Sequence, residues 1–331
     1  MDNNEINQIF EKFKQLQVIV IGDVMVDSYM WGKVDRVSPE APVPVVSVLT
    51  RENRLGGAGN VSLNIKALGA TPYLFSVTGD DDKGRKFNKL LVKEGLSSDG
   101  IFVDPKRITT VKTRIISKGQ HIARVDEETT ENIDSALEDK IIDSIEKLLS
   151  EKRIDVIVFV DYDKGAITPT LFTKVNEMAI NRGIPTAVDP KKRNFDLYKN
   201  ITLFKPNFKE FANGIGIPVE KGDLETIGKV AGSFRHKQNM KIIFVTLSEL
   251  GVFISNGTEG KYYPAIIRYI ADVSGAGDTV ISVASLALAS GLSLKTTALM
   301  SNLAGGLVCE KAGVVPVDKL QLINEMMSQK I

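Results

Sequence analysis

Short apolar segments alternate regularly with helical segments, and this alternation constrains the fold more than any other feature. From Ile133 onward the pattern predicts, in order, helix Ile133–Leu149, strand Ile154–Val160, helix Thr168–Asn181, strands Thr186–Val188 and Ile201–Phe204, helix Leu224–His236, strands Lys241–Thr246 and Val252–Ser255, and three C-terminal helices. Strands that alternate with helices form a parallel sheet with helices on both faces. We therefore expect a three-layer α/β/α sandwich around a mostly parallel sheet.

The N-terminal half shows the same pattern in a less regular form. It predicts strand Val18–Ile21, a helix that follows Gly56–Asn60 and stops at Gly69, strand Tyr73–Thr78 and helix Lys83–Glu94. Val18–Ile21 is a β-branched run of the kind found in buried parallel strands.

Two segments depart from this pattern and predict a small β-sheet. Arg36–Val45 contains three prolines, which forbid a helix and confine any strand there to a sheet edge. Thr109–Ser117 and His121–Val125 alternate around Lys118–Gln120, which predicts a hairpin. We expect one domain over residues 1–331, with a β lid formed by insertions at about 24–50 and 107–126.

The composition excludes several classes of function. The 331 residues carry a net charge of only +1, which gives no indication of a nucleic-acid or membrane partner. Cys309 is the single cysteine and there are two histidines, so an internal disulfide and a Cys/His metal site are excluded. Met1–Gln17 lacks the apolar core of a signal peptide, and no apolar run reaches membrane-spanning length. We expect a cytoplasmic protein.

The octet Asp272–Thr279 has the features of a phosphate site. The apolar run Val280–Ala289 behind it has helical spacing, so a helix should begin between Gly275 and Asp278. The first amides of a helix lack internal partners and lie at the positive end of its dipole, and glycine lets an anion approach them. Asp278 is then placed to act as a base. Taken alone, the octet is explained equally well by a helix cap.

Gly79–Gly84 has the glycine spacing of a Walker A loop, but other features exclude that interpretation. Arg85 and Lys86 follow it instead of Lys and Ser or Thr, and its three aspartates would repel phosphate. A turn at the start of a helix explains the segment better.

Gly57–Ser62 approximates a dinucleotide-binding fingerprint, with Asp80 as a ribose ligand. That fingerprint needs an apolar strand directly before its first glycine, whereas polar Arg51–Arg54 stands just upstream. The sequence therefore argues against a nicotinamide dehydrogenase.

Gly56–Asn60 and Asp272–Asp278, in that order, resemble the two signatures of the ribokinase-like carbohydrate kinases. The resemblance runs from about Gln17 to the C-terminus. Arg36–Val45 and Asp161–Gly165 resemble the heptose 7-phosphate kinase branch of that family. This resemblance implies ATP-dependent phosphorylation of the anomeric hydroxyl of D-glycero-β-D-manno-heptose 7-phosphate, on the route to ADP-heptose and the lipopolysaccharide core. Many members of the branch are fused to a nucleotidyltransferase domain, and the end of this chain leads us to expect a stand-alone kinase.

The resemblance also assigns roles at the phosphoryl-transfer centre. Asp278 matches the general base, which takes the proton of the attacking hydroxyl, a role worth ~10²–10⁴ in rate. The amides of Gly275, Ala276 and Gly277 match the anion hole that stabilises the transferring phosphoryl group.

The resemblance places the sugar against three residues from the first half of the chain. Asp27 and Asn60 match ligands of the sugar hydroxyls, and Gly57 allows the sugar to approach closely. The alternative role for Asn60 is that of a helix N-cap, and the two roles are compatible.

The nucleotide is expected to bind residues from the second half of the chain. Asn207 and Glu210 match a segment that holds Mg²⁺, through water, although an Asn followed three residues later by Glu also resembles a capping box. The other predicted contacts are Thr246, Ser248, Gly251 and Asn302. Ser248 stands where the family usually has glycine, and a surface position is the alternative for Asn302. The implied cofactors are ATP and Mg²⁺, and a K⁺ ion behind the anion hole stays open.

A phosphate on the sugar requires basic residues that a free-sugar kinase does not need. The candidates are Arg114 and Arg124 in the hairpin, Lys164 in the Asp161–Gly165 loop, and Lys191. We favour Lys164, because ligands bind in such sheets at loops that follow buried strand ends. For any one of these residues alone, a solvated surface charge is the simpler explanation.

The β lid is expected to cover the sugar and exclude water, and to join two copies of the chain into a homodimer. Two alternatives stay open. One is another sugar or sugar-phosphate kinase of this family, of the fructokinase, ribokinase or 1-phosphofructokinase type. The other is a non-catalytic sugar-binding protein, which would require a damaged base or anion hole, and both are intact here.

Overall fold

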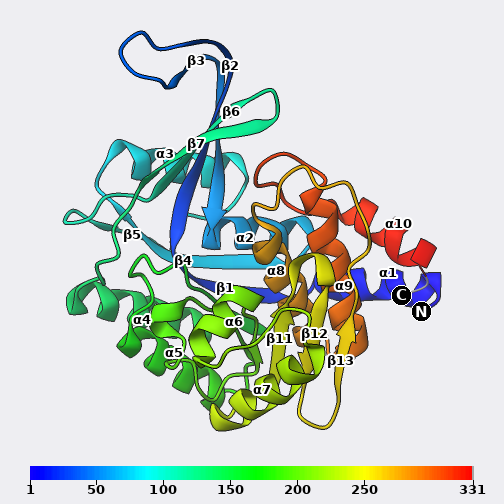
Figure 1. Ribbon diagram of the computed structural model, residues 1–331. Coiled ribbons are helices and arrows are strands. Elements are labelled where there is room, and N and C mark those ends of the chain that lie inside the picture. Colours follow the sequence, from blue (N-terminus) through cyan, green and yellow to red (C-terminus); the bar gives the residue numbers. More distant parts are fainter. Residues whose placement is uncertain (330–331) are drawn as a thin grey trace.

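Two β-sheets organise residues 1–329, the part of the chain that the computed structural model describes (Figure 1). The larger sheet has the strand order β13-β12-β11-β10-β9-β8-β1-β4-β5. Its strands are β1 (Gln17–Gly22), β4 (Thr71–Gly79), β5 (Ile101–Asp104), β8 (Val156–Val160), β9 (Thr186–Asp189), β10 (Leu203–Phe204), β11 (Ile242–Thr246), β12 (Val252–Ser255) and β13 (Gly260–Tyr263). Only β12 pairs antiparallel with its two neighbours, so the sheet is mostly parallel, as expected.

Helices cover both faces of this sheet. One face carries α1 (Asn3–Phe13), α2 (Ala58–Ala67), α3 (Asp82–Lys93), α8 (Ala276–Ala289), α9 (Leu294–Cys309) and α10 (Lys319–Gln329). The other carries α4 (Ser135–Glu151), α5 (Pro169–Asn181), α6 (Phe208–Ile215) and α7 (Leu224–Lys237). Short 3-10 turns lie at η1 (Lys192–Asn194) and η2 (Ser248–Leu250).

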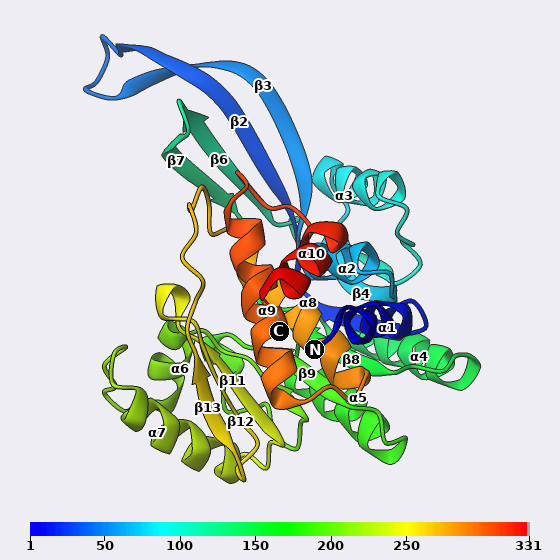
Figure 2. The ribbon, with the colours of Figure 1, turned by 90° about the vertical axis from the view of Figure 1, so that its right-hand side faces the viewer.

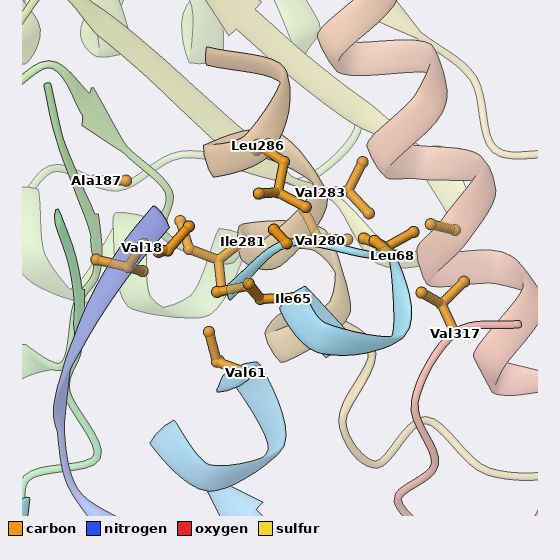
Figure 3. Packing of buried hydrophobic residues seen from close by; sticks show 14 of the residues in the cluster. Val18, Val61, Ile65, Leu68, Ala187, Val280, Ile281, Val283, Leu286 and Val317 are labelled. Carbon is orange, nitrogen blue, oxygen red and sulfur yellow. The ribbon is translucent and has the colours of Figure 1, made fainter. Parts of the chain in front are cut away.

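Strand β1 contributes side chains to the hydrophobic cores on both faces of the larger sheet. Val18 and Val20 belong to the cluster under α2 and α8, whereas Ile19 and Ile21 belong to the cluster on the opposite face. Alternate side chains of a strand point to opposite faces, so an unbroken apolar run is what a doubly covered strand requires. Figure 3 shows Val61 and Ile65 of α2 packed beside Val280 and Ile281 of α8, next to Val18. This packing fixes the start of α8 relative to α2.

The second sheet forms the lid and has the strand order β3-β2-β6-β7. Its strands are β2 (Val24–Val37), β3 (Pro44–Gly57), β6 (Val111–Ser117) and β7 (Gln120–Glu127), and it projects from the body of the molecule (Figure 2). Pro39 and Pro42 lie in the turn between β2 and β3, and Pro44 begins the edge strand β3, as the sequence predicted.

The structure also departs from the sequence-based expectations. Arg51–Arg54, the polar run found where a dinucleotide fingerprint needs an apolar strand, lies within the largely exposed strand β3, which was predicted only in part. This strand is antiparallel and belongs to the lid, so the dinucleotide fold is still absent at this point. Elements α1, α6, β5 and β13 were not predicted. Asp81 caps α3, which confirms the helix-start turn at Gly79–Gly84.

No helix among residues 1–329 is both long and apolar enough to cross a membrane.

Candidate active site

The N-terminus of α8 has the conformation that the octet predicted. Gly275 is the N-cap residue and has φ +81°, a left-handed conformation that favours glycine. A Cβ atom at Gly275 would lie 3.0 Å from Nδ2 of Asn60. Asp278 follows in the first turn and is buried. The expected helix therefore begins where the sequence placed it, with a carboxylate beside its first amides.

Two side chains from distant segments donate hydrogen bonds to the Asp278 carboxylate. Nδ2 of Asn60 lies 2.8 Å from Oδ2, and the hydroxyl of Tyr162 lies 2.8 Å from Oδ1. Burial raises the pKa of Asp278 to about 7, against the opposing effect of these two hydrogen bonds. A carboxyl group with a pKa near neutrality is suited to accept a proton during a reaction.

Asn60 does not cap its helix, so that alternative was wrong. The N-cap of α2 is Gly57, at φ +59°, and Asn60 lies within the helix. The side chain of Asn64 donates to the backbone oxygen of Asn60 at 2.9 Å, and its own Oδ1 accepts from the hydroxyl of Thr279 at 3.1 Å. The contact with Thr279 ties α2 to α8, and Nδ2 of Asn64 lies 3.3 Å from Oδ1 of Asn60, which helps to orient that side chain.

Tyr162 was not singled out from the sequence, although it lies in the Asp161–Gly165 motif. Its loop is held by the buried carboxylate of Asp23, which accepts hydrogen bonds from the backbone N–H groups of Tyr162, Lys164 and Ala166 at 2.8, 3.0 and 2.9 Å. Burial and the nearby Asp161 raise the pKa of Asp23 to about 6, against these three hydrogen bonds. Asp23 thus fixes the loop that brings Tyr162 to Asp278.

Asp27 lies at the root of the lid and pairs with Arg114. Both side chains are buried, and Nη1 of Arg114 donates to Oδ1 of Asp27. Burial raises the pKa of Asp27, and the charge of Arg114 opposes that shift. Gly56 is required here, since a Cβ atom would lie 2.2 Å from Oδ2 of Asp27. In contrast, Arg124 is exposed and donates to Asp126 at 2.9 Å.

A cleft of about 840 Å³ opens at the N-terminus of α8, within the size range of small-molecule sites. Its lining includes every residue that the sequence assigned to the nucleotide, together with the predicted anion hole: Asn207, Glu210, Thr246, Ser248, Gly251, Asn302, Gly275, Ala276 and Gly277. The structure therefore brings these residues together from widely separated segments.

Asn207 and Glu210 do form the capping box that was the alternative interpretation. Asn207 Oδ1 accepts from the Glu210 amide and Glu210 Oε2 accepts from the Asn207 amide, both at 2.9 Å. Glu210 also pairs with Lys191 through Oε1. Both side chains line the cleft, and oxygen donors suit a hydrated Mg²⁺. Among the described residues no cluster of three or more His, Cys, Asp or Glu could hold a metal alone.

Lys205 and Asp189 form a buried ion pair in the wall of the cleft that the sequence did not reveal. Nζ of Lys205 lies 2.8 Å from Oδ2 of Asp189 and 3.4 Å from the carbonyl oxygen of Gly277. Burial raises the pKa of Asp189, and the charge of Lys205 opposes this. A cation is therefore held directly beside the predicted anion hole. Lys205 precedes Asn207 by two positions, and this proximity was the only local signal.

The backbone conformation of Ser248 and the hydrogen bond of Asn302 constrain which residues fit at these two positions of the cleft. Ser248 has φ +54°, the left-handed conformation that explains the usual glycine in the family. Asn302, on α9, donates from Nδ2 to the carbonyl oxygen of Pro264 at 2.8 Å. Asn302 thus ties segment 264–273, which lines the cleft, to α9.

The remaining basic candidates are all paired with acids. Lys164 lies 2.8 Å from Glu128, and Lys191, besides pairing with Glu210, lies 5.1 Å from the ring centroid of Tyr162.

Comparisons with known proteins agree with this architecture. The model of the pfkB family carbohydrate kinases matches residues 15–319. The chain is 36% identical over 325 residues to the bifunctional protein HldE of Trichlorobacter lovleyi and 37% identical over 327 residues to that of Citrifermentans bemidjiense. These matches cover 98% of this chain but only 65% and 66% of the two relatives. The fold is similar to phosphofructokinase-2 from Escherichia coli, solved in complex with potassium. The TM-score is 0.77 at 17% identity, covering 95% of this chain and 98% of that one.

Proposed function

Because the chain belongs to the pfkB family of carbohydrate kinases, we propose that it phosphorylates the anomeric hydroxyl of D-glycero-β-D-manno-heptose 7-phosphate. ATP is the phosphoryl donor and the 1,7-bisphosphate is the product, a precursor of ADP-heptose and the lipopolysaccharide core. The kinase class follows from the family. The choice of sugar rests on Arg36–Val45 and Asp161–Gly165, which resemble the heptose 7-phosphate branch, and on the similarity to HldE proteins.

The environment of Asp278 is the observation that carries this proposal. Its carboxylate takes the proton of the sugar hydroxyl as that oxygen attacks the γ-phosphorus, and ADP leaves with the electron pair of the broken bond. Asn60 and Tyr162 hold the carboxylate in place through their hydrogen bonds. The amides of Gly275, Ala276 and Gly277 stabilise the charge on the transferring phosphoryl group, and Lys205 adds a positive charge beside them.

The sugar lies between the lid and the start of α2 in this proposal. Asp27 and Asn60 bind its hydroxyl groups, and Gly57 leaves room for close approach. The charge of Arg114 opposes the rise that burial causes in the pKa of Asp27, and its hydrogen bond fixes the orientation of that carboxylate. The lid excludes water from the phosphoryl group, which limits hydrolysis of ATP.

ATP occupies the cleft of about 840 Å³ in this proposal. Thr246, Ser248, Gly251 and Asn302 contact the nucleotide. Mg²⁺ neutralises phosphate charge when bound, and Asn207 and Glu210 hold its water ligands. We include K⁺ as an optional cofactor, since a protein of similar fold has been solved with potassium.

We further propose a homodimer through the lids. The outer part of the lid exposes Val37, Val43, Val48 and Leu49, with 39–64% of each residue accessible. Exposed apolar side chains on an edge strand are a typical contact surface for a second chain.

Coupled ADP release tests the function directly. The panel consists of heptose 7-phosphate, fructose 1-phosphate, fructose 6-phosphate, ribose and fructose, and kcat/KM is compared across it. We expect heptose 7-phosphate to give the highest value; a higher value for a free sugar would show that the branch assignment is wrong.

The variant Asp278→Asn should lose turnover and keep ATP binding. Retained turnover would remove Asp278 as the base, and ATP binding without ADP release in the wild type would favour the non-catalytic alternative.

A further inference from the structure

The strand register of the lid sheet places Lys112 beside Asp27, the residue proposed to bind the sugar hydroxyls. Asp27 of β2 pairs with Lys112 of β6, and Lys112 pairs in turn with Asp126 of β7. Directly paired residues of neighbouring strands project from the same face of a sheet. Lys112 therefore lies on the same face as Asp27, and its charge lowers the pKa of Asp27. The sequence did not single out this lysine.

Lys112 and Lys164 converge on one carboxylate. Nζ of Lys112 lies 3.0 Å from Oε2 of Glu128, and Nζ of Lys164 lies 2.8 Å from Oε1 of the same residue. The two lysine side chains are only 15% and 13% exposed, so neither is an ordinary solvated surface charge. Lys164 belongs to the loop that Asp23 holds and that carries Tyr162 to Asp278. Lys112, on lid strand β6, and Lys164, in the loop that carries Tyr162, therefore meet at Glu128.

The other basic candidates are committed elsewhere. Arg114 is bonded to Asp27, Lys191 pairs with Glu210, and Arg124 is 59% exposed. Lys112 also pairs with Asp126 at 3.0 Å, and Asp126 accepts a hydrogen bond from Arg124 as well. Three basic side chains therefore share two carboxylates, and this excess of positive charge is matched better by a phosphate monoester. It carries close to two negative charges and three acceptor oxygens, whereas a carboxylate offers one charge and two oxygens.

We propose that Lys112 and Lys164 bind the phosphate already carried by the sugar, and that Glu128 fills their site until that phosphate enters. Glu128 lies one residue beyond the end of β7, outside the ladder of strand hydrogen bonds, so its side chain can be displaced without breaking the sheet. A sugar without a phosphate cannot displace Glu128, so Lys112 and Lys164 stay paired with that carboxylate. This inference rests on the proposed function only in taking a sugar phosphate as the substrate.

Single substitutions test separately whether the two lysines bind the phosphate and whether Glu128 competes with it. Lys112→Ala and Lys164→Ala should each raise KM for the sugar phosphate by about ten- to a hundredfold, the range for a lost hydrogen bond to a charged group, and change KM for ATP little. Glu128→Gln keeps the shape but removes the competing charge. It should lower KM for the sugar phosphate by up to about fivefold, as expected for the loss of a partly exposed ion pair.

Glu127→Gln and Lys83→Ala are matched controls, because these residues form a neighbouring and more exposed ion pair at the end of the same strand. Both should leave KM unchanged. Thermal unfolding of each variant identifies any that fail to fold, and Glu128→Gln gives an answer even if a lysine variant does.

Inhibition by inorganic phosphate keeps this test independent of the substrate assignment. Phosphate should inhibit the wild type competitively against the sugar, Glu128→Gln more strongly, and both lysine variants more weakly. Equal inhibition of all four proteins would overturn the inference whatever sugar the panel favours. If a sugar phosphate is turned over while the lysine variants keep wild-type KM, the inference fails and the proposed function stands. If the wild type prefers a free sugar in the panel, the proposed function fails on its own.

Discussion

As the proposed base, Asp278 is subject to opposite requirements from catalysis and folding. A base must be ionised, yet burial disfavours the ionised form and raises the pKa of this carboxyl to about 7. The hydrogen bonds from Asn60 and Tyr162 stabilise the ionised form and keep the pKa from rising further. In the proposed mechanism, the two neighbours therefore determine how much of the enzyme is active at neutral pH.

The pH dependence of kcat/KM should report this balance. Below about pH 7 we expect a tenfold fall per pH unit, because protonated Asp278 cannot accept the hydroxyl proton. Tyr162→Phe removes a hydrogen bond that lowers the pKa, so the acidic limb should move up by about one to two pH units. Tyr73→Phe, whose hydroxyl donates to Gln17 instead, is the control. An unshifted limb in Tyr162→Phe would show that Tyr162 does not act on the base.

Asp278→Asn should make the protein more stable at alkaline pH. The pKa of Asp278 is raised from 3.8 to about 7 on folding, so its stabilising contribution is complete below pH 3.8 and is lost as the pH rises through 7. Asn resembles the neutral acid at every pH. We expect a gain in unfolding free energy on the order of 2 kcal/mol at pH 8 and none near pH 4, measured by urea unfolding. A gain that does not change with pH would contradict this linkage.

The sequence predicted the site residues whose role depends on local structure. It missed those whose role depends on contacts with residues from other segments. The glycines and Asp278 could be identified because a helix N-terminus is a local structure. Tyr162 and Lys205 could not, because their partners Asp278 and Asp189 lie far away in the sequence or on another strand. Asn207 and Glu210 satisfy the capping pattern and also line the cleft, so sequence alone could not separate those roles.

The lid is anchored at its root and exposed at its outer end. Tyr29 of β2 is fully buried, its hydroxyl accepts from the amide of Val314 at 2.8 Å, and the guanidinium groups of Arg54 and Arg114 lie 5.0 and 5.4 Å from its ring centroid. Arg54 also donates to the carbonyl oxygens of Ala312 and Val314, each at 3.0 Å. The root therefore moves with the body of the protein, while the outer strands present apolar side chains.

Leu49→Asp should weaken the proposed dimer. Leu49 lies on the edge strand β3 and is 63% exposed, so a buried charge in a lid-to-lid contact would cost several kcal/mol. Light scattering across a dilution series should show dimer for the wild type and monomer for the variant at the same concentration. Val92→Asp is the control, because Val92 is 69% exposed and lies on α3, outside the lid strands. A wild-type monomer at all concentrations would exclude the dimer.

Elements that are periodic or fully buried were predicted within a few residues, whereas some short or terminal elements were missed. Strands β5 and β13 have four residues each and mixed burial, which leaves no pattern to recognise. Helix α1 could have been found, because Ile6, Ile9, Phe10 and Phe13 have helical spacing and Asp2 with Glu5 forms a capping box. The order of strands in the sheet depends on long-range pairing, and no local pattern predicts it.

The catalytic centre exists only in the complete fold. Its proposed residues come from strand β2, helix α2, the loop after β8, the segment around β10 and the start of α8. Asn60 and Asp278, which share a hydrogen bond, are separated by 218 positions in the chain. Ligand binding at this centre should therefore stabilise the whole molecule and not one element.

Thermal unfolding with ligands tests this coupling. At a concentration of 100 times Kd, Mg-ATP should add about 2.7 kcal/mol to stability, and a chain of this size should respond with a rise of about 5 °C in Tm. The sugar phosphate should add a separate rise of similar size, because its proposed ligands lie on the lid side of the centre. Asp27→Asn should lose the rise caused by the sugar phosphate and keep the rise caused by ATP. A single transition should be seen throughout; a second transition that responds only to the sugar phosphate would show that the lid unfolds independently of the body.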